Sequence, residues 1–111
     1  LETKFLRLLR AAGMPDPVRQ HVVEDGARFV TGLDFCYLEV RFGIRLNGKA
    51  THLQAQQWQK DQCQANDLTL LDWTILDFTW EDVADRPERV LALVRQGLEI
   101  AAERGRWLGN G

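Results

Sequence analysis

The stretch that decides the fold is VRFGIRLN, residues 40–47, together with TILDFTW, residues 74–80. Residues 40–47 alternate between large apolar residues and arginine, glycine or asparagine, which is the period of a β-strand with one buried face. Residues 74–80 are rich in β-branched and aromatic residues and predict a second strand. Between them, residues 53–71 are polar with apolar residues at near-helical intervals. A helix there permits the two strands to pair in parallel.

Further elements extend outward from this unit on both sides. Residues 20–37 hold two β-rich runs separated by a turn at residues 24–26, which predicts a hairpin. Residues 1–12 place apolar side chains at helical spacing and stop at Gly13. DRPE, residues 85–88, resembles a capping box with Pro near the start of a final helix. The expected fold is therefore α/β, in the order α-β-β-β-α-β-α, with a mixed four-stranded sheet flanked by helices.

Length and composition set the broad class. The chain has 111 residues, 45% of them hydrophobic and 27% charged, which excludes a disordered chain and a disulfide scaffold. We expect one domain at residues 1–108 and a disordered tail at 109–111. The start at Leu1 suggests a fragment of a longer protein, whose other domains are candidate partners. The apolar runs are too short to cross a bilayer, so no membrane association is expected.

Charge and cysteine content narrow the possible partners. Cys36 and Cys63 form no C-x-x-C motif, so a reducing, cytoplasmic setting is expected. Fourteen Lys and Arg stand against 16 Asp and Glu, for a net charge of −2. A stand-alone nucleic-acid binder usually has a basic excess, so any contact with DNA must be local. The candidate basic side chains near the end of the 40–47 strand are Arg41, Arg45, Lys49 and Lys60.

Several motifs in fixed order resemble a known family. They are LETKF (1–5), GMPDP (13–17), LDFCY (33–37), GIRLNG (43–48), His52, Trp58 with Asp61, Asn66 with Leu68, and WTILDFTWEDV (73–83). Together they resemble a bacterial domain family related to very-short-patch repair endonuclease, in the PD-(D/E)XK nuclease superfamily, over nearly the whole chain. The resemblance implies a restriction-endonuclease-like core with its active site at one end of the sheet, DNA as the partner, and phosphodiester hydrolysis as the reaction.

The resemblance also implies a set of site residues. Family members carry an acid in the first helix, an Asp on the second strand, a Glu-x-Asp-Gly segment on the third strand and a His shortly after. Those acids would hold one or two Mg²⁺ ions, which generate a hydroxide nucleophile and neutralise the phosphate. Glu2 matches the helix acid, Asp34 the strand Asp and His52 the histidine.

The third-strand motif departs from the family, because residues 45–48 read RLNG. Arg45 stands at the glutamate position and changes the local charge by two units of the wrong sign. Asn47 stands at the aspartate position and offers one neutral oxygen. We expect metal affinity to collapse, and we hypothesise that Arg45 pairs with Asp34 and Glu2. The alternative is that Arg45 extends to water and touches neither acid.

Each candidate residue also has a structural interpretation. Glu2 suits any helix start, Asp34 any turn or cap, and His52 a junction between a strand and a helix. His21 lies in an early strand with no convergent acids nearby in sequence and is expected to be structural. The tryptophans expected to pack helix against sheet are Trp58, Trp73 and Trp80.

Three functions remain open. The first is a nuclease-like domain with a degraded metal site, kept for nucleic-acid binding or scaffolding. The second is an active Mg²⁺-dependent DNA endonuclease that uses Glu2, Asp34 and His52, with a substitute acid such as Glu39 or one from a partner chain. The third is a structural module that forms a homodimer and touches neither DNA nor metal.

Overall fold

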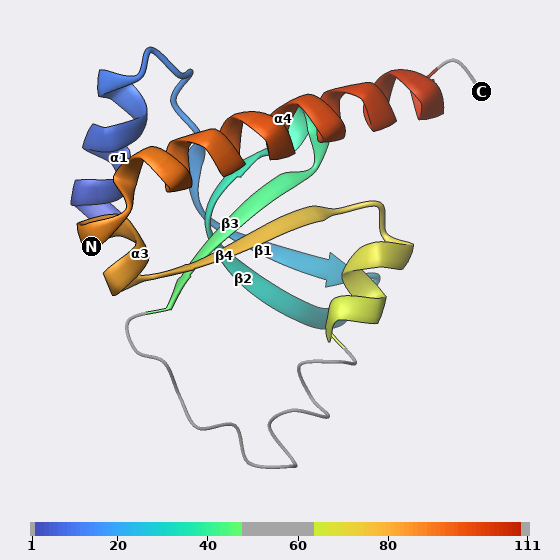
Figure 1. Ribbon diagram of the computed structural model, residues 1–111. Helices are drawn as coiled ribbons and strands as arrows, with labels where there is room; N and C mark the ends of the chain where they lie inside the picture. Colours follow the sequence, from blue (N-terminus) through green and yellow to red (C-terminus); the bar gives the residue numbers. More distant parts are fainter. Residues whose placement is uncertain (1, 48–63, 110–111) are drawn as a thin grey trace.

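A computed structural model describes residues 2–47 and 64–109 (Figure 1). The elements are α1 (Glu2–Ala11), β1 (Val18–Asp25), β2 (Arg28–Tyr37), the 3₁₀ turn η1 (Leu38–Val40), β3 (Phe42–Asn47), β4 (Thr74–Thr79), α3 (Trp80–Asp85) and α4 (Pro87–Gly109). Residues 64–70 are also helical and lead into β4, whereas the rest of the helix expected at 53–71 lies outside the described residues. No helix in the described ranges is both long and apolar enough to span a membrane.

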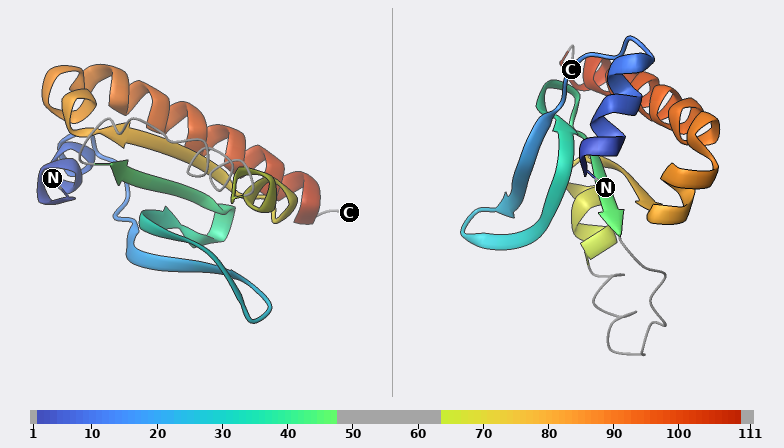
Figure 2. Two further views of the ribbon diagram at one scale, coloured as in Figure 1. Left: turned by 90° about the horizontal axis from the view of Figure 1, so that it is seen from below. Right: turned by 90° about the vertical axis from the view of Figure 1, so that its left-hand side faces the viewer.

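The strands form one mixed sheet in the order β1-β2-β3-β4. β1 pairs with β2 and β2 with β3 in antiparallel fashion, and β3 pairs with β4 in parallel. The α/β class, the mixed four-stranded sheet and the flanking helices are as the sequence predicts. β1 and β2 form the predicted hairpin, whose turn end extends away from α1 and α4 as a curved ribbon (Figure 2).

One face of the sheet packs against α1 and α4. Its core consists of Phe5, Leu9, Phe35, Phe42, Ile44, Phe78, Val83, Val90, Val94 and Ala101. The predicted final helix presents an apolar stripe to this core, because Leu93 and Leu98 pack against it beside Val90, Val94 and Ala101. A Cβ on Gly97 would lie 2.8 Å from the Phe42 ring, so glycine at this position lets α4 approach β3 closely. This contact fixes the helix over the sheet.

The other face of the sheet packs against the helical residues 64–70. Its core consists of Val23, Val30, Leu33, Cys36 and Leu68. Trp73 packs against this core, as expected, and the His21 ring lies 5.9 Å from the Trp73 ring, which agrees with a structural role for that histidine. Helices therefore cover both faces of the sheet.

Trp80 does not pack between helix and sheet, and that prediction is wrong. Its side chain is 46% exposed, and it is the first residue of α3. Thr79 ends β4 as a helix cap: its side chain accepts from the Asp82 N–H, and the Asp82 carboxylate accepts from the Thr79 N–H. This capping box ends the strand one residue before Trp80 and starts a short helix that the sequence analysis did not predict.

β2 changes faces at Asp34, and this irregularity positions the candidate site. Leu33 packs in one core cluster and Phe35 in the other, although residues two apart in a regular strand share a face. Opposite this point in β1, Gln20 has a left-handed backbone with φ of 56°. The pairing of β2 with β3 also ends beside it, at Phe35 and Ile44. Asp34 therefore lies where regular pairing is interrupted on both sides.

Candidate functional site

Two carboxyl groups meet where the sheet is interrupted. Glu2 comes from the first turn of α1 and Asp34 from β2. Burial raises the pKa of Asp34, and the neighbouring Glu2 carboxyl raises it further. A bond from the Leu46 N–H and the charge of Arg45 act in the opposite direction. Glu2 therefore lies close enough to Asp34 to act on its ionisation.

Asp34 is held by the backbone of β3. Its Oδ2 accepts a hydrogen bond of 2.6 Å from the N–H of Leu46. Because the ladder between β2 and β3 has already ended, this N–H has no backbone acceptor in β2, and the carboxylate takes that place. Asp34 therefore has a structural task in addition to any chemical one.

Glu2 is held by β1. Its Oε1 accepts a hydrogen bond of 2.6 Å from the Gln20 side chain, and its Oε2 lies 3.7 Å from an Arg19 nitrogen. These contacts orient the Glu2 carboxylate toward the sheet, so its position reflects more than a favourable charge at a helix start. The exposed Arg19 neutralises the pair only weakly, because solvent screens its charge.

Arg45 binds a different acid, so the predicted pairing with Asp34 and Glu2 is wrong. Its Nε donates to Asp77 Oδ1 at 2.7 Å and its Nη2 to Asp77 Oδ2 at 2.9 Å. Its Nη1 donates to Thr31 at 3.4 Å and to Gln64 at 3.2 Å. Arg45 and Asp77 are register partners in the parallel pairing of β3 with β4, so their side chains share a face. The alternative is correct in that Arg45 forms no ion pair with either acid within the described residues, and wrong in that it extends to water, because its side chain is only 26% exposed.

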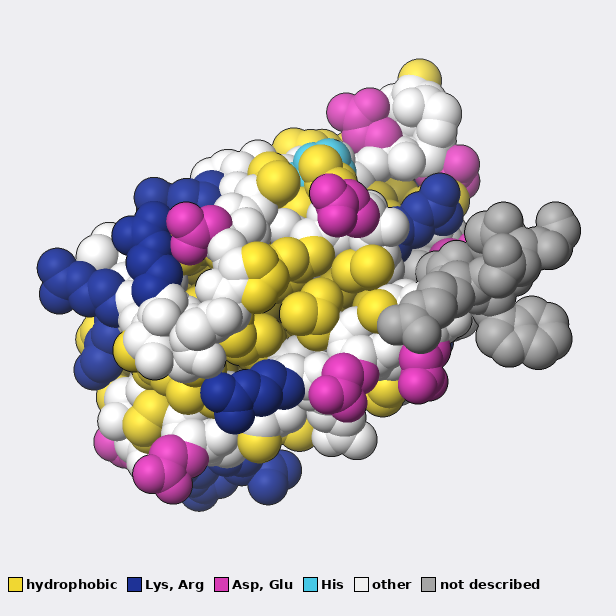
Figure 3. Space-filling model, turned by 90° about the horizontal axis from the view of Figure 1, so that it is seen from above, with side chains coloured by type: hydrophobic (Ala, Val, Ile, Leu, Met, Phe, Trp, Pro, Cys, Tyr) yellow, Lys and Arg dark blue, Asp and Glu magenta, His cyan; other side chains and the backbone are white. Residues whose placement is uncertain are grey.

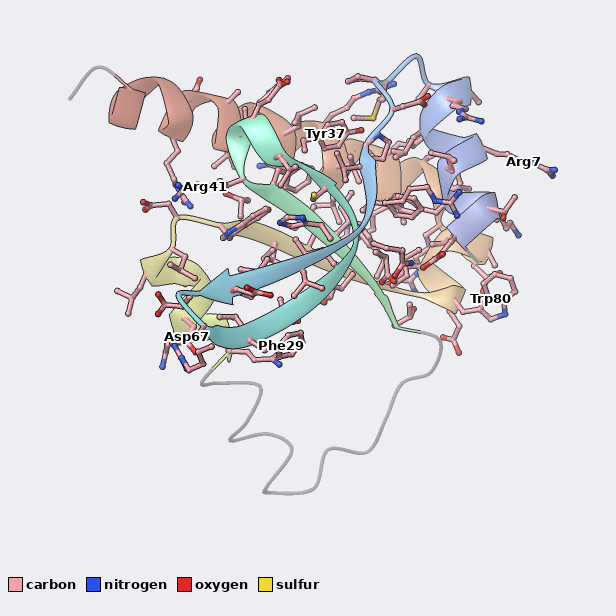
Figure 4. All side chains as sticks on the ribbon, turned by 180° about the vertical axis from the view of Figure 1, so that it is seen from behind. Arg7, Phe29, Tyr37, Arg41, Asp67 and Trp80 are labelled. Carbon is pink, nitrogen blue, oxygen red and sulfur yellow. The ribbon has the colours of Figure 1, made fainter. Side chains whose placement is uncertain are left out.

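The remaining candidates do not join this site in the described structure. Arg41 precedes β3 at the opposite end and donates to the Leu71 carbonyl at 2.8 Å; Figure 4 shows it on the far side of the sheet from Trp80. Glu39 lies in η1 near Arg41, away from Asp34. The candidates outside the described residues are His52, Lys49, Lys60 and the side chain of Asn47, whose backbone ends β3.

The described donors fit Mg²⁺ only in part. Within the described ranges, no group of three or more His, Cys, Asp or Glu side chains is placed to hold a metal. Glu2 and Asp34, which Arg19 neutralises only weakly, do suit a cation, and Mg²⁺ is often held by one or two carboxylates with several waters. The pair therefore fits one hydrated ion and falls short of a metal centre enclosed by protein.

Sequence analysis missed three residues that shape this site: Asp77, Gln20 and Arg19. A signal existed for Asp77, because it is a lone acid in the middle of an apolar strand and needs a partner. With the parallel register known, Arg45 would have been the obvious partner. Gln20 and Arg19 carried no such signal in the sequence.

Comparisons with protein-family models, curated proteins and solved structures gave no match. The structure itself shows an α/β fold in which Arg45 binds Asp77 and Glu2 lies near Asp34.

Proposed function

We propose that the chain is a nuclease-like DNA-processing domain, related to very-short-patch repair endonucleases, that contacts nucleic acid without hydrolysing it. The observation that carries this proposal is the position of Arg45 and its contact with Asp77. It stands where the family resemblance requires a metal-binding glutamate, and two hydrogen bonds to Asp77 fix its guanidinium there. Glu2 and Asp34 remain together beside it.

A fixed guanidinium opposes metal binding in two ways. It supplies no oxygen ligand, and its permanent charge acts on Asp34, whose pKa it lowers. A divalent cation entering beside Asp34 would be repelled by that same charge. Moving Arg45 away would break its bidentate contact with Asp77 and leave a carboxylate without its partner. Weak metal binding without catalysis is the expected result.

Support for nucleic-acid contact comes from α1, the helix that supplies Glu2. Lys4, Arg7 and Arg10 are exposed on this helix, and Arg7 points away from the body of the protein in Figure 4. Figure 3 shows Lys and Arg side chains gathered on the flank of the molecule where α1 lies. Such side chains position a phosphate backbone without reading its sequence. The net charge of −2 limits this contact to a small area and predicts strong sensitivity to salt.

A second candidate function is an active Mg²⁺-dependent DNA endonuclease. The observation in its favour is that Arg45 binds Asp77 and forms no ion pair with Glu2 or Asp34 within the described residues. Arg45 thus leaves the oxygens of both carboxylates open to a cation. A bound Mg²⁺ would supply a hydroxide nucleophile and neutralise charge on the phosphate. His52 would have to contribute from outside the described residues.

The test combines cleavage with metal titration. Supercoiled plasmid is incubated with the protein and Mg²⁺ or Mn²⁺, and Mn²⁺ binding is measured by calorimetry. We expect no cleavage and weak binding by the natural sequence. Arg45→Glu with Asn47→Asp and Asp77→Asn should raise Mn²⁺ affinity about tenfold or more, because it replaces a cation by ligands. Asp77→Asn alone is the control, since it frees Arg45 without adding an acid.

Two outcomes would contradict the proposal. Cleavage by the natural sequence that Asp34→Ala abolishes would establish the active endonuclease instead. Absence of duplex binding at both low and moderate salt would remove the nucleic-acid part, because phosphate contacts must appear first at low salt.

A further inference from the structure

The outer edge of β4 has free backbone groups. β4 pairs only with β3 within the described residues, and the Thr74 N–H donates to the Arg41 carbonyl on that side at 2.9 Å. Because backbone groups alternate sides along a strand, those of Ile75 and Asp77 point away from β3. No hydrogen bond is formed by these groups with any other described segment. At the end of the strand, the Thr79 N–H is taken by the Asp82 carboxylate.

A groove runs beside this edge. It has a volume of about 270 Å³ and lies between the end of β4 and the first half of α4. Its apolar lining is Leu93 with the largely buried Phe78 and Val90, and its charged lining is Asp77, Asp82, Arg86 and Arg89. A strand edge next to a helix, with an apolar hollow between them, is an arrangement that binds extended peptides by strand addition.

The groove favours an acidic ligand. Asp77 is neutralised by Arg45, whereas Asp82 keeps its negative charge while it caps α3, so Arg86 and Arg89 leave the lining with a small positive excess. Arg86 and Arg89 form no ion pair in the parts of the chain that the structure describes, and both lower the pKa of Asp82 through their charge. Two guanidinium groups at the border of an apolar hollow match a carboxylate next to an apolar side chain.

The other edge of the sheet is protected, whereas this one is not. β1 follows Pro17, has a left-handed residue at Gln20 and a register shift between Val23 and Glu24, and ends in acids. Such features keep an edge strand from pairing with another chain. β4 contains no proline and pairs with β3 in unbroken register. Its single charged residue, Asp77, is paired with Arg45.

We propose that the groove between β4 and α4 binds an extended acidic segment of a partner protein. The segment adds a strand to β4 through the backbone of Ile75 and Asp77. An apolar side chain packs on the lining of the groove, and a carboxylate binds Arg86 and Arg89. This inference goes beyond the proposed function, because it involves neither the contact of Glu2 with Asp34 nor nucleic acid.

The test starts from a displayed library of random decapeptides, with the full chain as the target. Enriched peptides are synthesised with a fluorophore, and their binding is measured by anisotropy. We expect apolar residues alternating with Asp or Glu. Arg86→Glu with Arg89→Glu should weaken binding about tenfold or more, because charged hydrogen bonds are lost. Arg7→Glu is the matched control on α1 and should change binding less than about twofold.

Two further measurements keep the proposal falsifiable. Bound peptide should slow amide exchange at Ile75 and Asp77. Methylating every second backbone nitrogen of the peptide should weaken binding when the methylated nitrogens are those that face β4, and should have little effect when they are the others. The proposal would be overturned if no peptide were enriched, or if the enriched peptides bound equally well after the arginine substitutions. It would also be overturned if the slowed amides lay in β1. Sedimentation showing a dimer that Arg86→Glu dissociates would assign the groove to a second copy of the chain and overturn it too.

Discussion

Asp34 and Asp77, on β2 and β4, have neighbours of opposite charge. Asp34 lies near a second acid, Glu2, and its pKa is raised by burial and by that neighbour. Asp77 is neutralised by Arg45, which donates two short hydrogen bonds to it. β3 serves both, because Leu46 donates its N–H to Asp34 while its neighbour Arg45 binds Asp77. The second contact ties β3 to β4. The first opposes folding electrostatically, because burial and the charge of Glu2 disfavour the ionised form of Asp34.

The largest effect is expected from removing the acceptor in the like-charged contact. Asp34→Ala leaves the Leu46 N–H without a partner, which should lower the free energy of unfolding by about 1–3 kcal/mol. Asp34→Asn keeps an acceptor oxygen and removes the repulsion from Glu2, so its effect should be close to zero. Urea denaturation at neutral pH measures both. Equal loss in the two variants would show that the charge of Asp34, and not its hydrogen bond, supports the fold.

A smaller effect is expected from breaking the oppositely charged contact. Arg45→Met removes four hydrogen bonds. It should lower the free energy of unfolding by about 1–2 kcal/mol, since Asp77 is 43% exposed and partly solvated. A double-mutant cycle with Asp77→Asn should give a coupling energy of about 1 kcal/mol. A coupling energy of zero would mean that the contact contributes nothing to stability.

The pH dependence of stability should distinguish Asp34 from a carboxylate with the opposite shift. Because the pKa of Asp34 is raised, the folded state binds more protons than the unfolded state between about pH 4 and the folded pKa, so stability falls as pH rises through that window. The pKa of Asp82 is lowered, first by the Thr79 N–H, so its contribution is lost as pH falls below about 4. Urea midpoints across this range should show Asp34→Asn removing the first slope and Asp82→Asn the second. A first slope that survives in Asp34→Asn would assign it to another group.

The smallest effect is expected from adding a metal. Mn²⁺ that binds only the folded state should stabilise the natural sequence by less than about 1 kcal/mol, given weak affinity. Glu2→Gln should remove this effect, because it takes away one of two carboxylates. Thermal unfolding with and without Mn²⁺ measures the shift. Asp77→Asn, which leaves Glu2 and Asp34 intact, is the control and should still respond to the ion.

Much of the fold follows from local patterns in the sequence. The alternation at 40–47 placed Phe42, Ile44 and Leu46 on one face of β3, and the structure packs all three in or against the same core. The helical stripe of α4 was equally readable. The end of β4 was not, because Thr79 and Asp82 form a cap that the β-rich pattern conceals. Single-residue hydrogen-bonding choices of this kind override propensity at the ends of elements.

The sequence by itself determined the order of the strands, the helices near the two ends of the chain, and the faces of β3 and α4. Only the tertiary structure decided that Arg45 binds Asp77. Strand parity fixes the face on which a side chain lies, but it does not fix which neighbour lies beside it. That neighbour depends on the register of β3 against β4, two strands joined by a long connection, and register is set by packing across the whole sheet.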